Sequence, residues 1–203
     1  MNSDQYKTIK EASEGFFKDR SSKFYAFAFP VKTEDDIAEF RAKIRKEYYD
    51  ARHHCYSYII GNDKSKFRIN DDGEPSGSAG KPIHGQLLSH DLTNIIVIVI
   101  RYFGGTKLGI PGLINAYKTA TKEAIANTKI LTKTINDVYS IEFEYPMMQT
   151  AMRFIKDENV EQILTKFEIS CYIEFSVRKS ESEMIFDKLK AIYGIKTKYL
   201  REE

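Results

Sequence analysis

Two stretches of this sequence concentrate glycine, serine and charged residues, the residue types that commonly bind anions. The first is "DDGEPSGSAGKPI" (71–83), where backbone amides, hydroxyls and a lysine lie at the start of an expected helix. The start of a helix favours binding of phosphate or carboxylate. The dipeptides Asp-Gly and Glu-Pro are also typical of turns, which need bind nothing. The stretch therefore predicts either a turn or an anion-binding loop, with the candidate residues Ser76, Ser78 and Lys81.

The second stretch, "RYFGGTKLG" (101–109), follows the apolar run "IIVIVI". It lacks the Gly-Lys-Ser/Thr of a P-loop and the G-x-G-x-x-G of a dinucleotide site. A glycine-rich turn between a strand and a helix can still bind an anion, or its glycines can serve only positive φ and close packing. The candidate residues are Arg101, Gly104, Gly105, Thr106 and Lys107.

A third polar segment, "ARHHCYSY" (51–58), could form a pocket with the acidic residues of the first stretch. The acids lack the spacing of a calcium loop, no zinc motif occurs, and Cys55 is expected to be a buried, unreactive thiol. We predict no metal, no cofactor and no catalytic residue, and the sequence does not decide whether the protein is an enzyme. The candidate pocket residues are His53, His54, Asp72 and Glu74.

Charge is distributed unevenly along the chain. Up to residue 130 there are 20 Lys+Arg against 16 Asp+Glu, a net charge of +4, while the remainder has 11 against 13, a net charge of −2. A basic face attracts phosphates, so RNA or the ribosome is the expected partner, with a solvated mixed surface as the alternative.

Hydrophobic periodicity predicts an α+β protein with two domains, 1–132 and 133–203. The first contains a helix within 32–51, with Thr33 as its N-cap, and a central strand over 93–102 that is apolar on both faces. The second follows the order β-α-β-β-α-β, which is the ferredoxin-like arrangement. In this second domain Ser180 is the expected N-cap of the second helix.

No apolar run approaches the roughly 20 residues that span a bilayer, and the N-terminus lacks the pattern of a secretory signal. The two cysteines fall in different predicted domains, which favours free thiols. We therefore expect a cytoplasmic protein without a membrane partner.

Taken together, "DDGEPSGSAGKPI", "VIVIRYFGGTKLGIPGLINAY" and, more weakly, "ARHHCYSY" resemble the signature of the IMPACT/YigZ family in order and spacing. The resemblance covers roughly residues 15–125. Two residues depart from the expected pattern: His54 stands where the family is expected to have Asn, and Pro111 where it is expected to have Gly. Pro111 suits a helix start but removes one amide donor from the predicted anion site.

This resemblance implies a first domain similar to the second domain of ribosomal protein S5, an α/β sandwich. It implies a small C-terminal domain similar to the fifth domain of elongation factor G. For function it implies an association with translation, since eukaryotic members regulate a translation-initiation kinase by competing for its activator protein. Similarity of fold is not by itself evidence of function.

Three functions remain open from the sequence. The first is an RNA- or ribosome-binding protein. The basic stretches favour it, and so does the aromatic pair Tyr102 and Phe103 if those rings are exposed. The second is a protein-interaction regulator of translational stress signalling. The third is an enzyme acting on a phosphorylated or nucleotide substrate.

Overall fold

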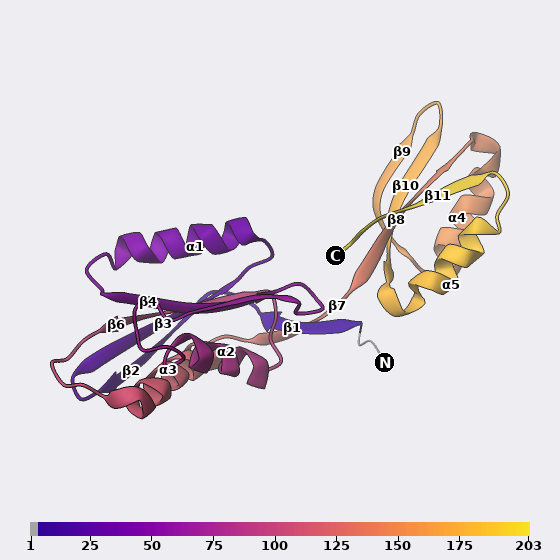
Figure 1. Ribbon diagram of the computed structural model, residues 1–203. Coiled ribbons are helices and arrows are strands. Elements are labelled where there is room, and N and C mark those ends of the chain that lie inside the picture. The colour runs from indigo at the N-terminus through magenta and orange to yellow at the C-terminus, as the bar shows by residue number, and fades with distance from the viewer. Residues whose placement is uncertain (1–3) are drawn as a thin grey trace. The chain divides into compact units, whose positions relative to one another are not determined.

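The computed structural model describes residues 4–203, which form two units (Figure 1). Residues 6–133 form the N-terminal unit, and residues 134–203 form the C-terminal unit together with Asp4 and Gln5. Asp4 belongs to the C-terminal unit because its carbonyl oxygen accepts a hydrogen bond of 2.8 Å from the Ile135 amide and its carboxylate pairs with Arg178. The boundary between the two units in the sequence lies between Lys133 and Thr134.

The N-terminal unit contains both strands and helices. Its elements in chain order are β1 (Gln5–Ile9), β2 (Ser13–Asp19), β3 (Ser22–Pro30), α1 (Glu34–Glu47), β4 (His53–Ile60), β5 (Lys66–Asn70), α2 (Gly80–Ser89), β6 (Ile95–Tyr102), α3 (Gly109–Ala126) and β7 (Ile130–Thr134).

A five-stranded antiparallel sheet with the order β2-β3-β6-β4-β5 is the centre of this unit, and β1 pairs with β7 in a separate two-stranded sheet. Helix α1 covers one face of the larger sheet, whereas α2 and α3 cover the other (Figure 1). Strand β6 lies in the middle, and its residues Ile95–Ile100 are buried. The prediction of a central strand that is apolar on both faces is therefore confirmed, because each face meets a helical layer.

Helix α1 begins where the sequence predicts. The Thr33 hydroxyl accepts a hydrogen bond of 3.1 Å from the Asp36 amide, and the Asp36 carboxylate accepts one of 2.9 Å from the Thr33 amide. This reciprocal pair is a capping box, which satisfies amides that have no partner inside the helix. Ile37 and Ile44 are buried against the sheet, so one face of α1 belongs to the core and the opposite face to solvent.

The C-terminal unit has the predicted order of strands and helices. Its elements are β8 (Asn136–Phe143), the 3-10 turn η1 (Tyr145–Met147), α4 (Met148–Asp157), β9 (Glu161–Phe167), β10 (Cys171–Arg178), α5 (Lys179–Lys190) and β11 (Ile195–Glu202).

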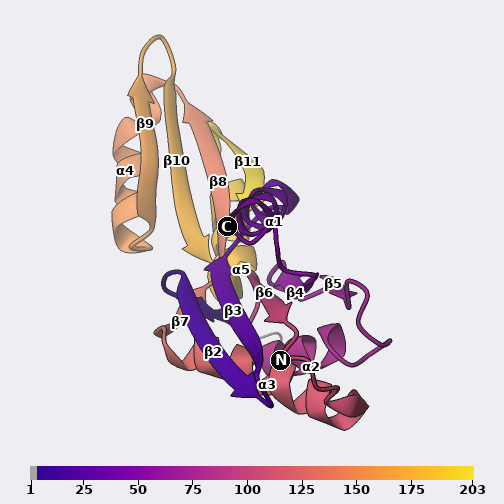
Figure 2. The ribbon, with the colours of Figure 1, turned by 90° about the vertical axis from the view of Figure 1, so that its left-hand side faces the viewer.

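These strands form one antiparallel sheet with the order β11-β8-β10-β9, visible in Figure 2 as adjacent ribbons. Both helices pack on the same face, over a core that includes Ile141, Phe175 and Leu189. This is the ferredoxin-like arrangement that the sequence predicts. The predicted N-cap at Ser180 is wrong: the N-cap is Arg178, two residues earlier and directly at the end of β10, and it makes no side-chain capping bond.

Candidate functional site

Asp71 organises the loop that carries the first glycine- and serine-rich stretch. Its Oδ1 accepts hydrogen bonds from the amides of Ala79 (3.1 Å) and Gly80 (2.8 Å), and its Oδ2 accepts one from the amide of Gly77 (2.8 Å). The amides of Ala79 and Gly80 stand at the start of helix α2, where the helix dipole favours a negative charge, and Gly77 lies in the turn before it. A carboxylate of the protein itself therefore accepts the hydrogen bonds of these amides, and binding of an external anion by this loop stays a prediction.

The two glycine-rich stretches meet at a buried ion pair. Arg101 Nη1 lies 2.7 Å from Glu74 Oε1 and 3.0 Å from Oε2, and the two side chains are 8% and 3% exposed. Tyr117 on α3 donates its hydroxyl to Glu74 Oε1 at 2.9 Å. Sequence analysis places Arg101 at an anion-binding surface, whereas the structure places its charge inside the unit, opposite an internal carboxylate.

Cys55 extends this network through strand β4. Its thiol lies 3.0 Å from the Asp71 carbonyl oxygen and 3.3 Å from the Tyr117 hydroxyl. Burial raises the pKa of the Cys55 thiol and, likewise, the pKa of the Tyr117 hydroxyl. A thiol held in its protonated form is a weak nucleophile, so this cysteine is structural, as expected.

The second glycine-rich stretch depends on its glycines for shape. A Cβ added at Gly104 would lie 2.1 Å from the Ser21 carbonyl carbon, so close packing against the β2–β3 turn requires glycine there. Gly105 and Gly109 have φ values of +86° and +71°, a region that favours glycine. Thr106 and Lys107 are exposed between them.

The predicted residues thus fall into two groups. Ser76, Lys81, Thr106 and Lys107 are exposed, and anion binding by them stays a prediction. Ser78 is buried and donates its hydroxyl to the Pro75 carbonyl oxygen at 2.6 Å, so it closes the turn internally.

Phe103 and Tyr102 border a shallow hollow beside the second stretch. The hollow has a volume of about 510 Å³ and is lined by Ser21, Lys23, Tyr25, Tyr48, Tyr102 and Phe103. Phe103 is 55% exposed, and the Arg101 guanidinium carbon lies 5.4 Å from the centre of its ring. The Phe103 ring is therefore exposed at the surface and does not belong to the core.

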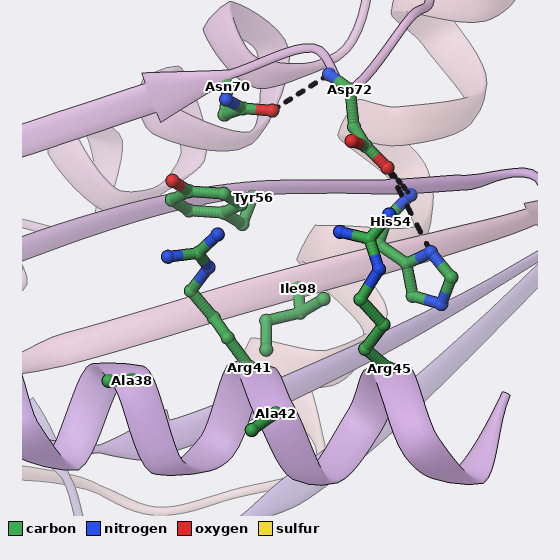
Figure 3. Close-up of a pocket in the computed structure, with 9 residues that line it drawn as sticks. All are labelled: Ala38, Arg41, Ala42, Arg45, His54, Tyr56, Asn70, Asp72 and Ile98. Carbon is green, nitrogen blue, oxygen red and sulfur yellow. Dashed lines mark hydrogen bonds and ion pairs between the residues drawn. The ribbon is translucent and has the colours of Figure 1, made fainter. Parts of the chain in front are cut away.

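A different pocket lies between α1 and the sheet, as Figure 3 shows. It has a volume of about 280 Å³. Helix α1 contributes an alternation of small and basic side chains, while strand β4, strand β5 and the loop after it contribute polar groups (Figure 3). The lining residues are Ala38, Arg41, Ala42, Arg45, His54, Tyr56, Asn70, Asp72 and Ile98.

Only part of the predicted histidine and acid cluster enters this pocket. His54 and Asp72 line it, and Asp72 Oδ2 accepts a hydrogen bond of 2.7 Å from the His54 amide. His53 points its Nδ1 at the Asp72 carbonyl oxygen, 2.8 Å away, and Glu74 belongs to the buried ion pair with Arg101. Burial lowers the pKa of His54 below the usual histidine value.

Sequence analysis missed Arg41 and Arg45, which lie on the same side of α1 one turn apart. Sequence analysis assigned this segment only as a helix and named none of its side chains as site residues. The signal that could have found them is the pattern Ala38, Arg41, Ala42, Arg45, in which small residues leave room around two cations.

Among the residues that the structure describes, no three histidine, cysteine, aspartate or glutamate side chains are grouped so as to hold a metal ion. Within residues 4–203, no helix combines the length and the apolar content that crossing a membrane requires.

Comparison with known proteins now places the chain in a family. Residues 20–125 match the Impact N-terminal domain, and the IMPACT family member YvyE of Bacillus subtilis is 32% identical over 178 residues, which cover 88% of this chain and 81% of YvyE. The chain belongs to the IMPACT family. A further member of the IMPACT family, YigZ of Escherichia coli, is 38% identical over 108 residues, which cover 52% of this chain and 53% of YigZ.

The fold also matches a solved structure over nearly its whole length. The crystal structure of a hypothetical protein aligns with a TM-score of 0.72 and 23% identity, covering 98% of each chain. This similarity supports the two-unit α+β fold, and the family rests on the sequence matches.

Proposed function

We propose that this IMPACT family protein is a translation-associated regulatory protein that binds RNA, free or within the ribosome, through the N-terminal unit. The family resemblance implies an association with translation, and the sequence matches establish the family. The observation that carries RNA binding is the exposed ring of Phe103 in a hollow that also presents Tyr102 and Lys23. Exposed aromatic rings next to cations are the combination on which single-stranded bases stack and phosphates bind.

We define the Phe103 surface as Lys23, Tyr102, Phe103 and Lys107. Lys23 pairs with Tyr102 across β3 and β6, and Lys107 follows Phe103 in the same loop. Because Glu74 compensates the charge of Arg101, these lysines are the cations that we assign to phosphate contacts. Arg101 instead supports the surface from below, through its contacts with Glu74 and the Phe103 ring.

Binding of a 5′-hydroxyl single-stranded RNA of mixed sequence, followed by fluorescence anisotropy, tests this proposal. Phe103→Ala should weaken binding by about 5- to 150-fold, because stacking on one base contributes about 1–3 kcal/mol. Lys23→Gln and Lys107→Gln should each make the dependence of log K on log salt shallower by about 0.7.

The matched controls are Tyr193→Ala, which removes an exposed ring of the C-terminal unit, and Lys122→Gln, which removes an exposed lysine of α3. Both should bind RNA as the unchanged protein does. If Phe103→Ala and Tyr193→Ala bind RNA equally tightly, the Phe103 surface is not the binding site.

A second candidate function is a protein-interaction regulator of translation. It is favoured by Ile110 and Ile114, which lie one turn apart on α3 and are 53% and 38% exposed. This function predicts a partner that stays bound after nuclease treatment and is lost with Ile110→Ser/Ile114→Ser. A partner that disappears with the RNA would instead favour the first function.

A further inference from the structure

The pocket under α1 has the properties of a ligand site, and it is separate from the Phe103 surface. Its polar lining is contributed by α1, β4, β5 and the loop after β5, while Ile98 of β6 forms part of its floor (Figure 3). At about 280 Å³ it is near the lower end of the size range of small-molecule sites. It has room for a small polar ligand.

Two cations face this pocket without an acidic partner. Arg41 places its guanidinium carbon 4.3 Å from the centre of the Tyr56 ring, and Arg45 lies one turn further along α1 (Figure 3). Within residues 4–203, neither arginine forms an ion pair. Like charges four residues apart destabilise a helix, so their placement at a pocket indicates an anionic ligand.

His54 identifies a second feature of the ligand. Its Nε2 lies 3.0 Å from the Tyr48 carbonyl oxygen, which can only accept, so Nε2 carries the proton of the neutral ring. Its Nδ1 is then an acceptor, is buried without a hydrogen-bond partner in the described residues, and lies 3.9 Å from Asp72 Oδ2. Nδ1 therefore lacks a donor, and a ligand hydroxyl would supply one.

Asn70 and Asp72 complete the polar lining. The Asn70 Oδ1 accepts a hydrogen bond of 2.8 Å from the Asp72 amide, which orients the side chain and leaves its NH₂ group as a donor. Two arginines and one aspartate give the lining a formal charge of +1. The lining therefore favours an anionic ligand, although it includes the Asp72 carboxylate.

We propose that this pocket binds a hydroxyl-bearing phosphate monoester, with Arg41 and Arg45 on the phosphate and with ligand hydroxyls donating one hydrogen bond to His54 Nδ1 and another to Asp72. A free mononucleotide and the phosphorylated end of an RNA chain share this chemistry. The site does not depend on the Phe103 surface.

Isothermal titration calorimetry of the full chain with AMP tests the proposal, with adenosine, sulfate and 2′,3′-dideoxy-AMP as comparison ligands. AMP should bind saturably with a Kd below about 1 mM. Adenosine should not bind, and loss of the ribose hydroxyls should weaken binding by about tenfold. Arg45→Gln should weaken AMP binding by at least about tenfold, because it removes a charge-assisted hydrogen bond.

Lys43→Gln is the matched control, because Lys43 is an exposed cation of α1 that does not line the pocket. Its Kd for AMP should equal that of the unchanged protein, and the Tm of both variants shows whether they fold. Arg41→Gln provides a second test if Arg45→Gln is unstable.

The proposal is overturned if AMP shows no saturation up to about 10 mM, if sulfate or adenosine binds as tightly as AMP, or if Arg45→Gln and Lys43→Gln behave alike. A 5′-phosphorylated RNA that binds more tightly than its 5′-hydroxyl form identifies an RNA end as the source of the phosphate. AMP binding without that difference identifies a free mononucleotide. RNA binding through Phe103 is measured with 5′-hydroxyl RNA, so either proposal can fail without the other.

Discussion

Arg101 and Glu74, 27 residues apart in the sequence, form an ion pair of 2.7 Å beneath the two glycine-rich loops of the N-terminal unit. The pair connects the end of β6 to the loop before α2, and Tyr117 of α3 donates a hydrogen bond to the same carboxylate. Its buried position makes it a structural link between the segments that carry the family motif.

Breaking this pair from one side should destabilise the N-terminal unit strongly. We expect Arg101→Met to lower the free energy of unfolding by about 3–5 kcal/mol, because Glu74 would remain buried without its counter-charge. The double variant Arg101→Met/Glu74→Leu should recover much of that loss. Urea denaturation followed by circular dichroism measures both, and equal losses for the single and double variants would contradict this account.

Removal of the Asp71 carboxylate should loosen the start of α2. Asp71→Ala leaves the amides of Gly77, Ala79 and Gly80 without their acceptor, and we expect a loss of about 1–2 kcal/mol, the upper range for an N-cap. Amide hydrogen exchange should become faster at these three positions. Unchanged exchange there would show that another group, such as water, replaces the carboxylate without cost.

Gly104→Ala should be destabilising because the new methyl group would meet the backbone of Ser21 and Ser22. We expect a loss of about 1–3 kcal/mol, the usual cost of overpacking. Gly85→Ala is the control, since a Cβ at this exposed position of α2 would meet nothing within 4 Å. It should stabilise the protein by about 0.5–1 kcal/mol, and thermal unfolding distinguishes the opposite signs.

Stability should fall as the pH falls through about 6.5. Burial lowers the pKa of both His54 and His84, so near that pH the unfolded chain binds protons that the folded protein excludes. The stability contributed by the neutral rings is present above the unfolded pKa and is lost as the pH drops below it. Urea denaturation at several pH values should show that the free energy of unfolding depends less on pH in His54→Asn than in the unchanged protein. An unchanged pH dependence would show that His54 does not contribute to it.

Local and periodic features of this fold were predictable from sequence. The capping box at Thr33 depends on residues only three positions apart, and the burial of β6 follows from an uninterrupted apolar run. The order of the C-terminal elements was equally readable from alternating periodicities. Ser180 failed as an N-cap because α5 starts directly at the end of β10, where the cap position belongs to Arg178.

The candidate site was less predictable because it depends on partners distant in sequence. Nothing near Arg101 shows that its charge is compensated by Glu74, and nothing near the glycines of 71–80 shows that Asp71 occupies their amides. In the sequence Arg41 looks like any solvated helix charge, because its contact with the Tyr56 ring of β4 exists only in the folded structure.

The shared network of Cys55, Glu74, Arg101 and Tyr117 also constrains how relatives of this chain can diverge. Each residue comes from a different segment, yet each one contacts another of the four inside the unit. A substitution at one position leaves the other side chains of the network without a hydrogen-bond or ion-pair partner. We therefore expect substitutions at these four positions to co-vary among homologues, although the positions lie in four separate segments of the sequence.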